Sequence, residues 1–142
     1  MKSIESKAGR VIVGKIEPNE DLIDSIVKIV KKHEIKSGFI SVIGALKKTT
    51  IGYFNIETKQ YNFKTIDEDV ELISCTGNLS YKDGDPLIHL HVTIGREDYS
   101  LLGGHLSQPS IVSITGEVYI YEISHKLNRV TDPKLDLSLL DL

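Results

Sequence analysis

The chain has 142 residues, of which 40% are hydrophobic and 26% are charged, and its formal net charge is -3 at pH 7. The length and composition are typical of one globular domain with one core, and no segment approaches the roughly 20 uninterrupted apolar residues of a membrane helix. The negative charge argues against a large nucleic-acid interface, because clustered Lys and Arg supply most of the affinity for phosphates.

The first part of the chain predicts one strand and one helix. Arg10–Ile16 is typical of a strand, and Pro18 ends it. Asn19 is the expected N-cap of a helix that starts at about Leu22 and ends before Gly38. Apolar residues on one face of this helix recur at spacings of three and four, namely Ile23, Ile26, Val27 and Val30. The sequence therefore predicts an amphipathic helix that packs on a sheet.

The following residues are rich in β-branched and aromatic side chains and predict strands. Short polar connections at 82–85 and 95–98 favour antiparallel hairpins. The predicted strands are Gly38–Leu46, Thr49–Ile56, Tyr61–Ile66, Val70–Tyr81, Leu87–Ile94, Tyr99–Leu106 and Ile111–Ile123. We therefore expect the α+β class, with a mainly antiparallel β-sheet and one amphipathic helix packed on it.

We expect residues 1–142 to form a single domain, with a core at about 8–124 and a C-terminal tail at 125–142. In the tail, Leu135, Leu137 and Leu139 alternate with polar residues, which predicts a strand that pairs with its own sheet or with a neighbouring subunit. Cys75 is the only cysteine, so an intramolecular disulfide is excluded, and we expect its thiol to be buried in a strand. With no apolar leader at the start of the chain, we expect a cytoplasmic protein.

Two histidines share one face of a predicted strand. Alternation along Leu87–Ile94 sends Leu90 and Val92 to the core, so His89 and His91 lie on the opposite face, roughly 6.6 Å apart. Two imidazoles placed in this way can converge on one metal ion. Two partly exposed strand histidines with no ligand remain the alternative interpretation.

His105 is the candidate third ligand, but it needs a particular register. If 95–98 closes a four-residue hairpin, His105 falls opposite Ile88 and faces the core. A one-residue bulge at Gly103-Gly104 would bring His105 opposite His89 instead. The double glycine is therefore the expected cause of the third ligand's orientation.

Three neutral imidazoles with an open fourth position are typical of a catalytic zinc site. Nickel, iron and copper also accept imidazole ligands, so the spacing predicts a divalent metal, with zinc as the expected one. Glu71, Glu117 and Glu122 are candidates for carboxylates that orient the histidines.

Several short motifs follow one another along the chain: Gly9-Arg10, the segment from Ser37-Gly38 to Leu46, Ile51-Gly52-Tyr53, His89-Leu90-His91, Gly103-Gly104-His105-Leu106 and Gly116-Glu117-Val118. Taken in this order, they resemble the prokaryotic stand-alone members of the PPC (DUF296) family, which is related to the PPC domain of plant AT-hook nuclear proteins. The resemblance covers about residues 8–124. It implies a β-sheet domain with a packed helix, assembly as a homotrimer, and a metal site at His89, His91 and His105.

The histidine pattern and the resemblance predict a protein that binds a divalent metal and an unknown small molecule, with metal-assisted hydrolysis or hydration as the conceivable reaction. The trimer is implied by the resemblance alone. Whether the chain is an enzyme stays open, as does whether the three histidines meet within one chain or across an interface. The alternative is a non-catalytic assembly or ligand-sensing module, or a DNA-binding regulator, as the family label suggests. The chain lacks the Arg-Gly-Arg core of an AT-hook, however. A cupin-like metalloenzyme is a third possibility, and the early helix and the turn position of Glu97 count against it.

Overall fold

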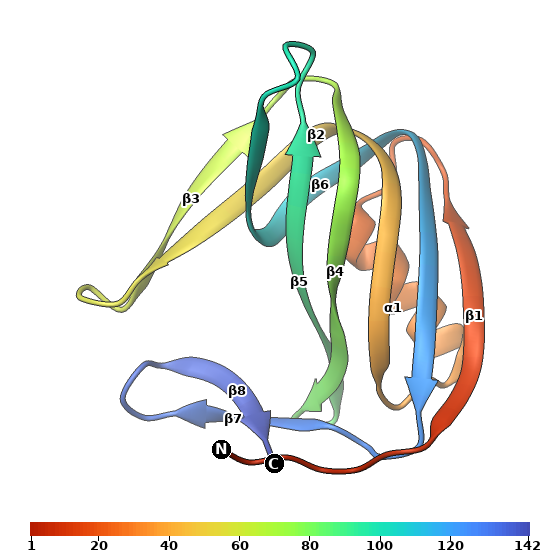
Figure 1. The fold of residues 1–142 in the computed structure, drawn as a ribbon, viewed down its shortest axis with the longest axis vertical. Coiled ribbons are helices and arrows are strands. Elements are labelled where there is room, and N and C mark those ends of the chain that lie inside the picture. The colour runs from red at the N-terminus through yellow and green to blue at the C-terminus, as the bar shows by residue number, and fades with distance from the viewer.

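A computed structural model describes all residues from Met1 to Leu142 as a twisted antiparallel sheet with one helix, α1 (Leu22–His33), against one face (Figure 1). This arrangement is the expected α+β class. The strands are β1 (Ala8–Ile16), β2 (Gly38–Asn55), β3 (Gln60–Ile66), β4 (Val70–Lys82), β5 (Asp85–Gly95), β6 (Leu101–Ile123), β7 (Asn128–Asp132) and β8 (Leu137–Asp141).

Strands β2 and β6 are longer than the sequence pattern predicts. Each joins two predicted strands, so the expected breaks near Lys47 and Pro109 lie inside continuous strands. The register between β2 and β6 shifts three times between Gly44 and Thr50. Such irregularities let a strand bend without ending, because the extra residue is absorbed locally. The polar residues at these places therefore mark bends in the sheet.

The strand pairings close a circuit around the centre of the molecule. Strand β2 pairs with both β6 and β4, and β5 joins β6 to β4. Strand β3 extends the end of β2 into an arm, and the β7–β8 hairpin lies on the other side of the opening that this arm leaves (Figure 1). The β2–β3 arm and the β7–β8 hairpin therefore face each other across this opening, on one side of β5 (Figure 1).

The N-cap of α1 is Asp21, so the prediction of Asn19 was wrong. The Asp21 carboxylate accepts hydrogen bonds from the backbone N–H groups of Ile23 and Asp24, at 3.0 and 3.2 Å. Asp21 has the extended backbone that an N-cap requires, whereas Asn19 lies in a turn with a φ of 73°. Helix α1 ends at His33, before Gly38, as expected.

No helix in the structure has the length and apolar character needed to cross a membrane.

The core lies between the sheet and α1. From the helix, Leu22, Ile26 and Val30 are fully buried, and from β5 the residues Leu90, Val92 and Ile94 are buried against the same cluster. Cys75 also lies here with no exposed surface, as predicted. Because side chains alternate along a strand, the residues between the β5 core positions must lie on the other face of the sheet.

The tail contains two strands where the sequence predicted one. Strands β7 and β8 pair with each other in an antiparallel hairpin, and Leu135 lies in the turn between them. The hairpin is joined to the rest of the sheet by one bridge, between Tyr81 of β4 and Asn128 of β7, and by the hydrogen bond from the Tyr81 N–H to the Leu127 carbonyl. The terminal strand therefore pairs within its own chain.

Candidate metal centre

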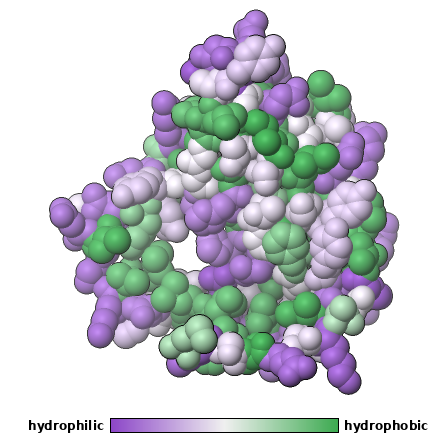
Figure 2. Space-filling view, viewed as in Figure 1, coloured by the Kyte–Doolittle hydropathy of each residue, from purple (hydrophilic) through white to green (hydrophobic).

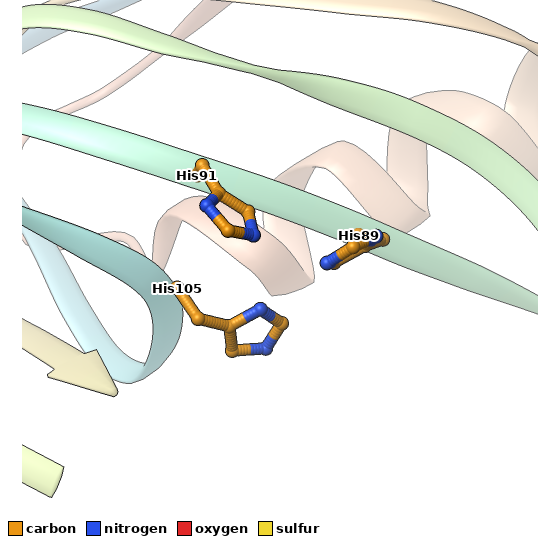
Figure 3. A group of neighbouring side chains, drawn as sticks. All are labelled: His89, His91 and His105. Carbon is orange, nitrogen blue, oxygen red and sulfur yellow. The ribbon is translucent and has the colours of Figure 1, made fainter. Parts of the chain in front are cut away.

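The structure brings His89, His91 and His105 together within one chain. His89 and His91 project from the face of β5 opposite the core, as predicted, and His105 projects from β6 toward them (Figure 3). The ring centroids lie 5.1 to 5.6 Å apart. One potential ligating atom from each residue lies within 4.8 Å of the others.

The number of residues in the β5–β6 connection places His105 on this face, so the prediction of a bulge was wrong. Gly95 pairs with Leu101, so the β5–β6 connection has the five residues Arg96–Ser100 instead of the predicted four. The register then runs without a shift to His105, which pairs with His91. Directly paired residues share a sheet face, so the odd length of the connection places His105 on the histidine face.

The double glycine has a different role from the predicted one. A Cβ atom on Gly103 would lie 2.7 Å from the carbonyl oxygen of Val92, and one on Gly104 would lie 2.8 Å from the carbonyl oxygen of Gly52. Both distances are too short for a carbon and an oxygen that are not bonded. The two glycines therefore let β6 approach β5 and β2 closely beside His105.

The surroundings favour neutral imidazole rings. Burial lowers the pKa of His89 to about 4, helped by the positive charge of Arg129 and by His105 and His91. Burial, His91 and Arg129 likewise hold the pKa of His105 below its ordinary value. A neutral imidazole keeps a lone pair available, which is the form that binds a metal ion.

The donor set fits a divalent metal ion. The Nδ1 atom of His105 is buried and has no hydrogen-bond partner in the protein. A buried polar atom without a partner is costly, so it points to a missing ligand. Three imidazole nitrogens are a donor set suited to zinc and to the neighbouring transition metals.

The predicted carboxylates are not what the histidines contact. Glu122 forms an ion pair with Arg10 at 2.7 Å, and neither Glu71 nor Glu117 forms a hydrogen bond with a histidine of the cluster. The expectation that one of these residues orients the ligands is therefore not supported by the contacts in the structure.

Arg129 of β7 is the residue at the cluster that sequence reasoning missed. Its Nη2 lies 3.1 Å from Nδ1 of His89, and it also donates to Asn78, Ser80 and the carbonyl of Ser138. Arg129 is 7% exposed, and burial lowers its pKa. It has no carboxylate within 4.0 Å, since none of the ion pairs of the protein includes it. A single basic residue in a tail gives no sequence signal of this contact.

A hollow of about 240 Å³ opens beside the cluster, between the β2–β3 and β7–β8 hairpins (Figure 2). His89, His105 and Arg129 line it together with apolar side chains from β5 and β8. A larger hollow of about 690 Å³ lies near Ile73 and Leu101, but none of the three histidines lines it. The smaller hollow is therefore the one that can place a small molecule next to the histidines.

Comparisons of the sequence and of the structure with known proteins agree on one family. Residues 3–124 match the profile of the Plants and Prokaryotes Conserved domain. A metal-containing protein from Archaeoglobus fulgidus is 31% identical, with a TM-score of 0.91 over 100% of both chains. A plant- and prokaryote-conserved protein from Pyrococcus horikoshii is 33% identical, with a TM-score of 0.90 over 100% of this chain and 98% of that one. A candidate DNA-binding protein from Bacteroides thetaiotaomicron is 32% identical, with a TM-score of 0.88 over 96% of both chains.

Among curated proteins, the bifunctional protein GlmU of a Synechococcus strain is 25% identical over 126 residues, or 87% of this chain. The match spans 19% of that protein, so this chain corresponds to about a fifth of the length of its curated relative. The profile match covers most of the chain, and the similarity to the Pyrococcus protein covers 98% of that protein. The chain therefore belongs to the Plants and Prokaryotes Conserved domain family.

Proposed function

We propose that this protein binds one divalent metal ion, zinc, through His89, His91 and His105, and presents an open coordination position to a small molecule. The observation that carries the proposal is the convergence of three imidazoles around the buried, unpartnered Nδ1 of His105. The metal-containing protein of Archaeoglobus fulgidus, 31% identical over its whole length, supports the same assignment.

The chain's own residues would hold the metal, exclude water from one side and shape the ligand site. His89 and His105 are half-buried, whereas His91 is exposed, so access would be from the His91 side and from the neighbouring hollow. A bound divalent metal would supply Lewis acidity, which suits hydrolysis or hydration of a small molecule.

We also propose that residues 1–142 act as one domain and assemble as a homotrimer. Support comes from apolar side chains that lie exposed on β1, β2 and β6, on the sheet face opposite α1. These are Val11, Val13, Phe39, Tyr119 and Tyr121, with exposed fractions between 40% and 62%. A contiguous apolar surface of this kind is typical of subunit interfaces. Sedimentation equilibrium would test the assembly, and a mass equal to that of one chain would contradict it.

The metal assignment is tested by metal analysis of tag-free protein. Plasma mass spectrometry should find near one equivalent of zinc per chain, and the triple variant His89→Ala, His91→Ala, His105→Ala should lose it. A matched control is the double variant His33→Ala, His125→Ala, because both residues lie outside the cluster. Absence of metal from the native protein, even after reconstitution with zinc, would refute the proposal.

DNA binding is the second candidate function, favoured by the candidate DNA-binding protein of Bacteroides thetaiotaomicron. Lys31, Lys36 and Lys126 line one hollow beside α1 and could contact phosphates. Metal-independent binding of duplex DNA that weakens steeply with salt would favour this candidate. The net charge of -3 argues for the metal-binding candidate.

A further inference from the structure

The hollow beside His89 carries positive charge with no negative side chain to balance it. Arg129 is buried there without a carboxylate partner, and no Asp or Glu lines the hollow. A divalent ion held by three neutral imidazoles would keep both of its charges and add them to that of Arg129. Charge buried without compensation is costly, so this site should favour an anionic ligand.

Arg129 already has an N–H group to offer. A guanidinium carries five N–H groups, and the structure uses four of them, on Ser80, Asn78, His89 and the Ser138 carbonyl. The group without a partner is on Nη1, since Nη1 makes a single hydrogen bond.

Metal binding at His89 would free a second N–H group. Arg129 can only donate, so Nδ1 of His89 accepts in this contact, and the neutral ring then carries its proton on Nε2. If His89 binds a metal through Nδ1, the ion replaces Arg129 at that atom. If it binds through Nε2, the proton moves to Nδ1, which can no longer accept. In both cases an Nη2 N–H of Arg129 loses its partner.

Apart from Ser138, the remaining walls of the hollow are apolar. Leu87 comes from β5, Leu137 and Leu139 come from β8, and the ring of Tyr61 comes from β3 and lies 4.9 Å from that of His105. Two N–H groups on separate nitrogens match the two oxygens of a carboxylate, which arginine often binds in a bidentate manner. Apolar walls suit the hydrocarbon part of the same molecule.

We propose that this hollow binds a small carboxylate with an apolar body, and that Arg129 is the anion-binding residue. The proposal rests on the proposed metal function for the release of the second N–H group. The unpaired charge of Arg129 and the apolar walls do not depend on a metal. The cavity of about 240 Å³ limits the ligand to a small molecule.

Calorimetric titration with benzoate and with benzamide tests the proposal, because the two molecules have nearly the same shape and differ in charge. We expect zinc-loaded protein to bind benzoate at least about tenfold more tightly than benzamide. Arg129→Gln should remove most of this preference, and Arg129→Lys should keep part of it. Lys82→Gln is the matched control, since Lys82 also holds the tail hairpin but does not line the hollow. Circular dichroism of each variant checks that it is folded.

Equal affinity for benzoate and benzamide in the native protein would overturn the proposal, and this comparison needs no variant to fold. An unchanged preference in folded Arg129→Gln would overturn the role of Arg129. Zinc content, measured on the same samples, separates this failure from that of the metal function. If the protein takes up no zinc, the titration is made on metal-free protein. A benzoate preference that depends on Arg129 then still supports the anion site, and its absence overturns it.

Discussion

Replacing Arg129 by Met should detach the C-terminal hairpin from the sheet. Arg129 makes four hydrogen bonds from a buried position, to β4, β5 and β8. The backbone joins the hairpin to β4 only by the Tyr81–Asn128 bridge and the hydrogen bond from the Tyr81 N–H to the Leu127 carbonyl. A hydrogen bond from a charged group contributes about 1.5 to 3 kcal/mol to stability. Replacing Arg129 also removes the cost of taking its charge out of water on folding, and this gain offsets part of the loss. The net loss should therefore be about 2 to 4 kcal/mol.

Native-state hydrogen exchange measures this loss where it occurs. The amides of the Val130–Leu139 pair should exchange roughly 30- to 1,000-fold faster in Arg129→Met, since about 1.4 kcal/mol corresponds to a factor of ten. The amides of β5 should change little, because the hairpin contributes few contacts to the core. Lys82→Met is the control: Lys82 also donates to the hairpin, through Thr131 and Ser138, from a more exposed position, and its loss should cost less than about 1 kcal/mol. Equal effects of the two substitutions would refute the reasoning.

Three further results should follow from the site and its strands. Metal-free protein should lose about 1 to 2 kcal/mol of stability as the pH falls from about 6.5 to about 4. The reason is that burial lowers the pKa of His89 to about 4 in the folded protein, so the unfolded chain takes up the proton first. Urea unfolding at several pH values measures this loss, and His89→Gln should flatten the dependence of stability on pH. Gly104→Ala should destabilise the fold by about 1 to 3 kcal/mol and weaken zinc binding, because the added Cβ would press on the Gly52 carbonyl. Chelator competition measures the zinc affinity, and an unchanged affinity would contradict this expectation. Cys75 should react with a thiol reagent only on unfolding, because its side chain is fully buried and burial raises its pKa to about 12. Rapid labelling of the native protein would argue against this burial.

Local patterns were enough to predict most elements and two of the three histidine positions. Alternation between apolar and polar residues in β5 places His89 and His91 on one face, since a strand has a fixed period of two. Patterns of this kind are weaker where strands bend. Polar residues near Lys47 and Pro109 read as ends of strands, although β2 and β6 continue through them with shifts of register.

The position of His105 depends on the parity of one connection. Four residues between β5 and β6 would turn His105 to the core, and five turn it to the sheet face of His89 and His91. The sequence around Gly95 and Leu101 does not by itself reveal where the pairing of β5 with β6 stops. The predicted bulge therefore gave the right sheet face for the wrong physical cause, and His105 pairs with His91 instead of the predicted His89.

By itself the amino-acid sequence determined the α+β class, the amphipathic helix, the face of His89 and His91 and the burial of Cys75, because these follow from periodicity and composition within short segments. The tertiary structure alone decided the meeting of His105 with its partners and the contact of Arg129 with His89, which lie 40 residues apart in the sequence. Such contacts depend on register and on how distant strands pack, and no local pattern encodes either of them.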